Sequence, residues 1–263
     1  MAICTRYRDQ IAVSTALKPK ASAWPVQVVP KKHPIGRNRL VHEKPSAAMR
    51  ALRMAVPWAL VLLTACASQP PPPDWQANAF AALNSYSSAY LEGNSRVADV
   101  EFARAKTEVS RTGRPDLMAR IELVRCAAQV ASLVLEPCSG YLALAADAKP
   151  PEQAYAAFIS GRWSGLDAKL LPVVYQGLKS HGLSQIQDPL SRLIAAGSLL
   201  QRELLTPTDI GLAVDSASEQ GWRRPLLAWL GVQLKRAQTV GDTAQAASSQ
   251  RRIDLVLQRP SAN

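Results

Sequence analysis

The feature that most constrains the fold is a double row of apolar side chains between residues 117 and 135. Successive members of each row stand mostly three or four positions apart, which is the spacing of one face of an α-helix. The first row is Leu117, Ile121, Val124, Ala128, Ala131 and Leu135, and the second is Leu123, Cys126, Val130 and Leu133. Because two adjacent faces are apolar, this helix needs cover on more than one side. We therefore expect a central helix that begins at Pro115-Asp116 and runs to about residue 134.

The rest of residues 75–259 carries the turn signals of further helices. Proline and N-capping side chains favour a helix start, and glycine favours a helix end. Such signals stand at Gly93-Asn94, at Ser95 as the N-cap of the second helix, at Thr112-Gly113, at Lys149-Pro150 and at Thr206-Pro207. Further apolar stripes run over residues 190–204 and 226–234, whereas alternating strand patterns with hairpin turns are absent from the sequence. We predict an all-α domain over 75–259, with eight to ten helices, followed by a tail over 260–263.

Residues 75–113 resemble one tetratricopeptide unit. The second of its two expected helices carries Ala98, Phe102 and Ala105, spaced as the small, aromatic and small positions of that repeat, and Gly93-Asn94 stands at the turn. A weaker echo follows at Gly241-Asp242 and Ala246. The 34-residue period of the family is not sustained through the middle of the chain. The resemblance implies antiparallel helical hairpins stacked as a solenoid, and the alternative is an irregular helical bundle.

A short apolar segment precedes this helical region. Residues 54–65 are 12 positions of mainly apolar character, preceded by Arg50 and Arg53 and ended by Leu63-Thr64-Ala65-Cys66. A transmembrane helix needs about 20 apolar residues, so the segment is too short to span a bilayer. A cationic start, a short apolar core and a small-residue cleavage site form an export signal. The alternative is a buried helix that ends in Thr-Ala-Cys, but four prolines at 70–73 follow almost at once.

Leu63, Thr64, Ala65 and Cys66 resemble the lipobox of bacterial lipoproteins. The resemblance implies that residues 49–65 are a signal peptide cut after Ala65, and that Cys66 is lipidated on its sulfur and then on its new amine. More than one acyl chain anchors a protein stably. Ala67 stands where an aspartate retains such proteins in the inner membrane, which implies an outer-membrane location facing the periplasm. Residues 66–74 would be a proline-rich tether, in which four prolines in polyproline II add roughly 12 Å.

Residues 1–48 match neither the signal nor the helical domain. They are rich in Lys, Arg and Pro and show no apolar period. We expect a disordered leader or, since Met49 directly precedes a well-formed signal, an upstream region that is not translated; the alternative is a long cytoplasmic start of the signal. Residues 1–65 carry 11 basic and 2 acidic side chains, so +9 of the net charge of +11 lies there. The remaining +2 gives no support for nucleic acid as a partner.

Cys126 and Cys138 remain for pairing once Cys4 is assigned to the leader and Cys66 to lipid. An exported domain with two cysteines favours a disulfide. A helix to residue 134 carries the chain about 12 Å beyond Cys126, and four residues return at most about 14 Å. Bridged α-carbons lie within roughly 7 Å of each other, so the chain must reverse sharply at 135–137. We predict the disulfide; the alternative is two buried thiols packed as small apolar groups.

Candidate catalytic and metal-binding residues are scarce. His181 is the one histidine after the expected cleavage site, beside Gly182 at an expected helix end, which is typical of a surface or capping role. We therefore predict no catalytic residues, no metal site and no cofactor. We interpret two further groups of charged residues as solvated helix faces. They are the acids Glu101, Glu108, Asp116 and Glu122, and the basic pairs Arg223-Arg224, Lys235-Arg236 and Arg251-Arg252. For the basic group, the alternative is a patch that binds an acidic partner or anionic lipid headgroups.

Three functions are compatible with these features. The leading hypothesis is a non-enzymatic scaffold, anchored to the membrane through Cys66, that presents a groove to a periplasmic protein partner. The alternatives are a cell-wall enzyme or accessory factor that acts on peptidoglycan, and a carrier of a lipid or another apolar ligand. An exposed concave face would favour the scaffold, a cleft with two carboxylates the enzyme, and a closed apolar cavity the carrier.

Overall fold

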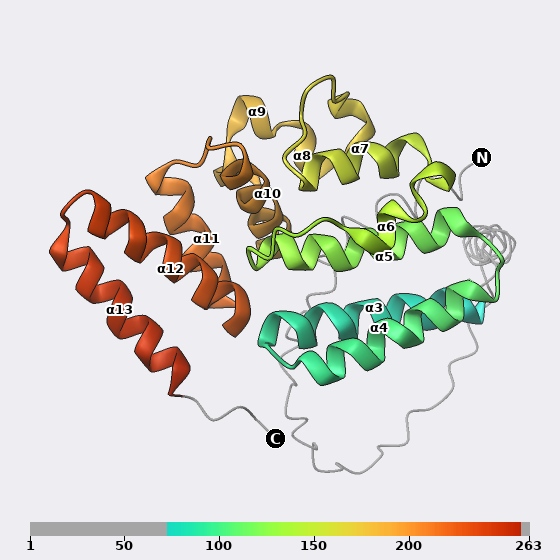
Figure 1. The fold of residues 1–263 in the computed structure, drawn as a ribbon, viewed down its shortest axis with the longest axis horizontal. Coiled ribbons are helices and arrows are strands. Elements are labelled where there is room, and N and C mark those ends of the chain that lie inside the picture. Colours follow the sequence, from blue (N-terminus) through green and yellow to red (C-terminus); the bar gives the residue numbers. More distant parts are fainter. Residues whose placement is uncertain (1–72, 259–263) are drawn as a thin grey trace, which may run out of the picture. The chain divides into compact units, whose positions relative to one another are not determined.

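A computed structural model of the chain describes residues 73–258, and this part consists of helices without any strand (Figure 1). The α-helices are α3 (Asp74–Glu92), α4 (Ser95–Ser110), α5 (Pro115–Ala131), α6 (Ser139–Leu142), α7 (Pro150–Ile159), α8 (Val173–Gln176), α9 (Leu178–His181), α10 (Pro189–Gln201), α11 (Pro207–Glu219), α12 (Arg223–Thr239) and α13 (Thr243–Leu257). Short 3-10 helices are η2 (Ala145–Asp147), η3 (Ala168–Leu170) and η4 (Leu183–Gln185). The all-α prediction is confirmed. Eleven α-helices in this part exceed the expected eight to ten because α6, α8 and α9 have only four residues each, too few to show a helical period.

The predicted turn signals mostly stand at helix ends. Gly93 ends α3 with φ of 95°, a conformation that glycine adopts without steric cost. α4 is capped by Asn94, whose side chain accepts the amide hydrogen of Val97, so the prediction of Ser95 as the N-cap is wrong by one residue. Thr206 and Asp209 form a reciprocal capping box at the start of α11.

Helix α5 is the central element, as its two apolar rows predict. It contacts α3, α4, α6, α7 and α10, which lie on different sides of it. Leu117, Ile121, Leu123 and Val130 are buried. α10 approaches so closely that a Cβ atom added at Gly197 would lie 2.5 Å from the carbonyl oxygen of Val130. The glycine is therefore required for this helix contact.

The C-terminal end of α5 differs from the expectation. The helix stops at Ala131 rather than near residue 134, because Leu133 adopts the left-handed conformation with φ of 58°. The amide of Leu133 donates to the carbonyl of Val130, and that of Val134 donates to Gln129, which is a Schellman ending. The chain thus reverses before the predicted turn at 135–137. As a consequence, Leu135 leaves the helix and is exposed.

The N-terminal hairpin of α3 and α4 buries the positions that resemble a tetratricopeptide repeat. Ala98, Phe102 and Ala105 are all buried. In a solenoid each repeat contacts only its neighbours, but α3 also contacts α12, near the other end of the described residues. Trp229 of α12 is fully buried and donates from Nε1 to the carbonyl of Ala131 at 3.0 Å. The tetratricopeptide detail is not confirmed, and these contacts fit the irregular-bundle alternative.

The predicted leader, signal peptide and most of the tether lie outside the described residues, as does the tail at 260–263. Among the helices of residues 73–258, none combines the length and apolar character that crossing a membrane requires.

Replacing Gly197 by alanine tests the close contact between α5 and α10. We expect Gly197→Ala to lower the free energy of unfolding by about 1–3 kcal/mol, because the helices must separate to admit the methyl group. Gly211→Ala in α11 is the matched control, since nothing lies within 4 Å of an added Cβ atom there. The control should raise stability by about 0.5–1 kcal/mol through helix propensity. Urea unfolding measures the stability of both variants. Equal changes in their free energy of unfolding would contradict the close contact of α5 and α10 at Gly197.

Candidate functional site

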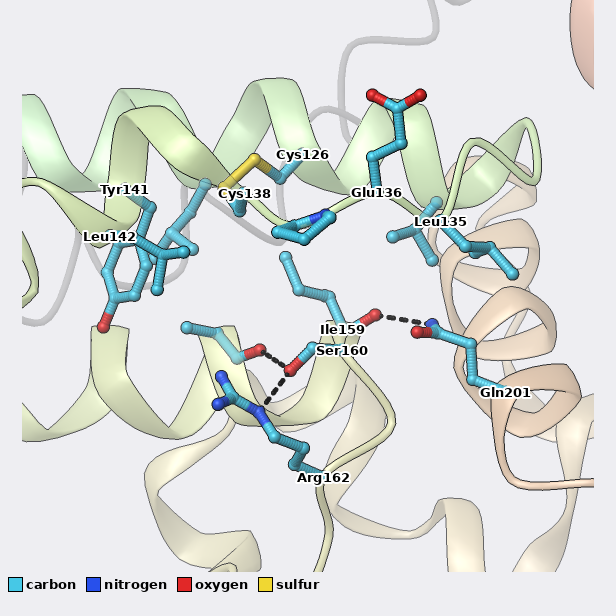
Figure 2. A pocket seen from close by; sticks show the side chains of 14 residues that line it. Cys126, Leu135, Glu136, Cys138, Tyr141, Leu142, Ile159, Ser160, Arg162 and Gln201 are labelled. Carbon is cyan, nitrogen blue, oxygen red and sulfur yellow. Dashed lines mark hydrogen bonds between the residues drawn. A yellow bond between two sulfur atoms is a disulfide. The ribbon is translucent and has the colours of Figure 1, made fainter.

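A pocket of about 270 Å³ lies between α5, the loop that follows it, α6, α7 and α10 (Figure 2). Leu123, Cys126 and Val130 of α5 line one side, and Ala156 and Ile159 of α7 line another. The 135–138 loop, the last two residues of α6, Ser160, Arg162 and Gln201 of α10 complete the lining. The lining is predominantly apolar, which is typical of binding pockets.

The disulfide predicted between Cys126 and Cys138 is present, and both cysteines line the pocket. Their α-carbons are 5.8 Å apart, within the range that a disulfide requires. Cys126 belongs to α5, whereas Cys138 directly precedes α6. The bond therefore ties the returning loop to the central helix and makes this loop one wall of the pocket.

The rim of the pocket exposes large apolar side chains. Leu135 is 40% exposed and Leu142 is 53% exposed, and they stand on the loop and on α6. Two charged residues, Glu136 and Arg162, also line the pocket, from the loop and from the segment after α7 (Figure 2). The opening of the pocket thus combines two exposed leucines with charges of both signs.

Hydrogen bonds hold the polar residues of the rim. Arg162 donates from Nε to the hydroxyl of Ser160 at 3.0 Å, and that hydroxyl donates to the carbonyl of Ala156 at 2.7 Å. Gln201 donates from Nε2 to the carbonyl of Ile159 at 2.8 Å. These bonds link the end of α7 to α10 and to the segment that bears Arg162. These hydrogen bonds therefore fix the α7 side of the pocket.

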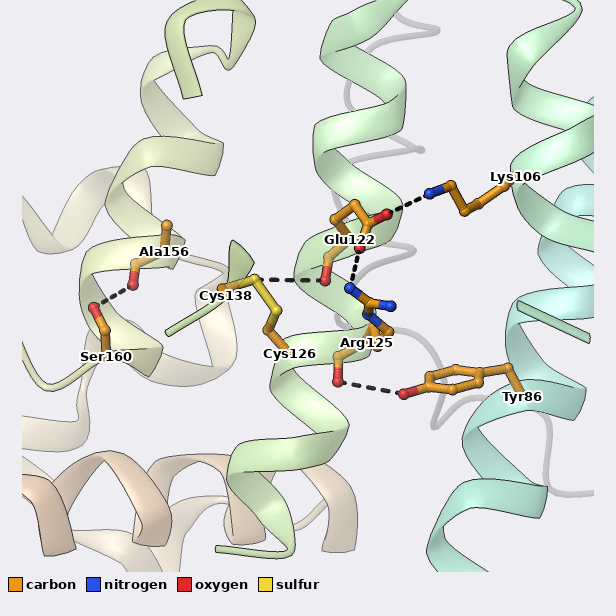
Figure 3. Close-up of a disulfide and its surroundings, with 8 residues drawn as sticks. All are labelled: Tyr86, Lys106, Glu122, Arg125, Cys126, Cys138, Ala156 and Ser160. Atoms are coloured by element: carbon orange, nitrogen blue, oxygen red, sulfur yellow. Dashed lines mark hydrogen bonds and ion pairs between the residues drawn. A yellow bond between two sulfur atoms is a disulfide. The ribbon is translucent and has the colours of Figure 1, made fainter. Parts of the chain in front are cut away.

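Glu122 lies behind the loop and is buried, so its interpretation as part of a solvated face is wrong. Its carboxylate is 2.9 Å from Nζ of Lys106 on α4 and 2.9 Å from Nη2 of Arg125 (Figure 3). On α6, a Cβ atom added at Gly140 would lie 2.2 Å from the carboxylate, so the carboxylate would have to shift to admit a side chain there. Glu122 thus joins α4, α5 and α6. The sequence could not predict this burial, because an acidic residue near arginines on a helix gives the same sequence pattern whether its carboxylate is exposed or buried.

The remaining acids that the sequence singled out also have structural partners. Glu108 is buried and pairs with Arg111 at 2.9 Å, so the solvated-face interpretation is wrong for it too, whereas Glu101 is only partly buried. Asp116 accepts from Arg114 and lies 2.7 Å from Nζ of Lys149. These two cations hold the pKa of the Asp116 carboxyl well below its usual range. The sequence did not single out Glu152, which is buried and pairs with Arg120.

The first of the three basic pairs is not a solvated face either. Arg224 donates from Nε to the carbonyl of Tyr90 at 2.7 Å and from Nη2 to the hydroxyl of Ser95, and its guanidinium lies 4.1 Å from the Tyr90 ring centre. Arg223 donates to the carbonyl of Val256. This pair therefore connects α12 to α3, α4 and α13. By contrast, Lys235, Arg236 and Arg251 are exposed, and Arg252 is half-buried.

His181 lies exposed at the end of α9, away from the pocket lining. Its Nδ1 atom is 2.9 Å from the hydroxyl of Ser180 and 3.3 Å from the carbonyl of Gly177. The side chain therefore bonds locally, within its own turn, at the surface. Within the described residues, no group of three or more His, Cys, Asp or Glu side chains could hold a metal ion.

Comparison with models of protein families gave no match, and neither did comparison with curated proteins or with solved structures. The functional interpretation therefore depends on the residues of this chain alone. Of the site residues predicted from the sequence, Cys126 and Cys138 lie together at the pocket. Leu63, Thr64, Ala65 and Cys66 lie outside the described residues. The sequence did not predict the pocket, and its nearest signal was the cysteine pair with Pro137 directly before the second cysteine.

Breaking the disulfide should destabilise the helical domain. Closing so short a loop contributes on the order of 3 kcal/mol by restricting the unfolded chain. We expect a reductant to lower the free energy of unfolding by about that amount, measured in urea. The variant Cys126→Ser/Cys138→Ser is the matched control, since a reductant should leave its stability unchanged. Equal stability of the wild-type chain with and without reductant would contradict the disulfide.

Proposed function

We propose that this chain is a lipid-anchored protein of the bacterial cell envelope that binds a protein partner through the pocket beside the disulfide. The observation that carries the proposal is the apolar pocket with exposed Leu135 and Leu142 on its rim. Partner side chains that contribute most to binding energy are those that fill such pockets at the centre of an interface. The anchor would be Cys66, with the module on the periplasmic side of the outer membrane.

The size of the pocket favours a side chain of a partner protein, rather than a lipid, as the group that it binds. Its volume of about 270 Å³ is below the roughly 300–1,000 Å³ typical of sites for whole small-molecule ligands. One or two apolar side chains of a partner suit this space better than a complete acyl chain. The proposal therefore places the scaffold function above the carrier.

The chemistry of the site favours binding over catalysis. The carboxylate of Glu122 is held by Lys106 and Arg125, and that of Glu152 by Arg120. Paired-carboxylate hydrolysis needs an acid and a base that both face the substrate. Because these buried acids serve as structural ion pairs, the enzymatic alternative has less support than the scaffold.

A second hollow, of about 290 Å³, lies against α3, α4 and α5 and is lined by Tyr86, Tyr90 and Phe102 among others. Its cations, Lys106 and Arg125, are the ones that hold Glu122. Tyr86 and Phe102 are buried and pack with ring centres 5.2 Å apart. These side chains already serve the packing of the hairpin, so we place the partner at the disulfide pocket.

The anchor is tested by replacing the cysteine that would carry it. We expect Cys66→Ser to abolish incorporation of labelled palmitate and to move the protein from the membrane fraction to the soluble fraction. Cys126→Ser/Cys138→Ser, which replaces the two other cysteines after the expected cleavage site, is the matched control and should change neither readout. Palmitate labelling that persists in Cys66→Ser would contradict the lipid anchor, whatever the pocket binds.

The binding pocket is tested by placing a charge on its rim. Leu142→Glu should reduce recovery of cross-linked envelope proteins about tenfold, since burial of a leucine contributes roughly 1.5–3 kcal/mol. Leu142 is already exposed, so the variant should fold as the wild type does. Val173→Glu on α8, also exposed, is the matched control and should leave recovery unchanged. Equal recovery of envelope proteins by Leu142→Glu and Val173→Glu would mean that the partner binds at another surface.

A further inference from the structure

The hollow against α3, α4 and α5 is formed by one face of each of these helices. Each helix contributes a pair of lining residues four positions apart, a spacing that places both side chains on the same face. The pairs are Tyr86 and Tyr90 on α3, Phe102 and Lys106 on α4, and Arg125 and Gln129 on α5. The hollow shares no lining residue with the disulfide pocket. It is therefore a separate place on the molecule, and an inference about it does not depend on the proposed function.

One end of the hollow carries an excess of positive charge. Lys106 and Arg125 share one carboxylate, that of the buried Glu122, which is 2.9 Å from each of them. Two positive charges and one negative charge leave a net charge of +1 at this end. The side chain of Lys106 is 47% exposed and that of Arg125 is 33% exposed, so both can reach a bound group. Figure 3 shows Lys106 and Tyr86 pointing toward α5, on which Arg125 stands.

Both cations keep hydrogen-bond donors that Glu122 does not use. An ammonium group has three N–H donors and a guanidinium group has five. Within residues 73–258, Arg125 uses Nη2 for Glu122, whereas its buried Nε has no hydrogen-bond partner. A buried N–H group without a partner is unfavourable. An anion on the exposed side of this guanidinium would offset that cost through a charge-assisted hydrogen bond.

Apolar surface continues from this cationic end. The ring centre of Phe102 is 5.9 Å from Nζ of Lys106 and 4.9 Å from Cζ of Arg125, so the ring packs against both cations. Phe102 itself is buried, whereas Tyr90 is half-buried and Ala103 is exposed. Tyr90 and Ala103 therefore offer apolar surface to a ligand whose anionic group lies at the cations.

Asp99 limits the charge of such a ligand. It is exposed and lines the hollow at a distance from Lys106 of seven positions, or about 10 Å along α4. Its carboxylate repels a second anionic group. The hollow is therefore suited to a ligand with a single negative charge at the end that Lys106 and Arg125 form.

We propose that this hollow binds a carboxylate carried by an apolar group, such as the C-terminal residue of a peptide. The carboxylate would lie between Lys106 and Arg125, and the apolar group would pack against Tyr90 and Ala103. A volume of about 290 Å³ suits one or two residues of a peptide, or a free acid of that size. The inference thus adds a small anionic ligand to a chain whose proposed function is to bind a protein.

Calorimetric titration of the full chain in detergent micelles tests the class of ligand, with micelles alone as the background. Acetyl-glycyl-phenylalanine should bind with a Kd of about 1 mM or lower. Its C-terminal amide should bind about tenfold more weakly, because the amide cannot form the charge-assisted hydrogen bonds. Equal Kd values for the acid and the amide would overturn the proposal.

A second acid identifies the source of the carboxylate. The probe 3-phenylpropionate carries the same carboxylate and ring without a peptide bond. If it binds as tightly as the peptide, apolar acids in general are ligands, whereas weaker binding indicates a peptide end. Binding of neither acid would overturn the proposal.

Charge changes at exposed positions test the place of binding. Ala103→Glu places a carboxylate in the hollow and should weaken binding of the acid about tenfold, since it repels the ligand and narrows the space. Val97→Glu is the matched control, because Val97 is 42% exposed and stands on the opposite side of α4 from the lining residues. It should leave the Kd unchanged. Equal Kd values for these two variants would overturn the proposal.

A gain of affinity provides a test that a damaged fold cannot imitate. Asp99→Asn removes the negative charge that opposes the ligand and should lower the Kd of the acid about twofold at low salt. The same substitution should leave the Kd of the amide unchanged, because the amide carries no negative charge. Weaker binding of the acid by Asp99→Asn, or an equal change for acid and amide, would overturn the proposal.

Discussion

The structure depends on burial of helix α5 on more than one side. Apolar side chains such as Leu123 and Val130 face different neighbours, so α5 supplies a common surface for the N-terminal hairpin, α7 and α10. Without α5, the hairpin, α7 and α10 would each lose an apolar surface against which they pack. The position of α5 also decides the position of the site, because its residues line the pocket.

Two interactions at α5 hold the pocket wall in place. The disulfide attaches Cys138 to Cys126 (Figure 3). One turn before Cys126 on α5, the carboxylate of Glu122 packs against Gly140 of α6. A buried carboxylate is costly unless cations accompany it, and Lys106 and Arg125 fill that role. The loop and α6 are therefore held by a covalent bond and by an ion-pair cluster, which explains how a short, exposed segment can form a defined wall.

Contacts between distant segments connect the C-terminal helices to the N-terminal hairpin. Arg224 bonds to Tyr90, 134 positions away, and Trp229 bonds to the end of α5. A stack of independent repeats would not need these bonds. They leave α13 at the edge of the described residues, with Leu255 and Leu257 exposed.

The sequence by itself determined the helix content, most helix ends and the disulfide partners. The reason is that helix caps, the spacing of apolar residues and the distance that a loop can span all depend on residues near one another in the sequence. It also suggested an anchor at Cys66, which lies outside the described residues. Only the tertiary structure decided that α5 ends early at Leu133, that Glu122 is buried and that Arg224 joins two ends of the domain. The physical reason is that the burial of a charge and the shape of a pocket depend on partners brought from other segments. Lys106 and Gly140 meet at Glu122 only after the chain has folded.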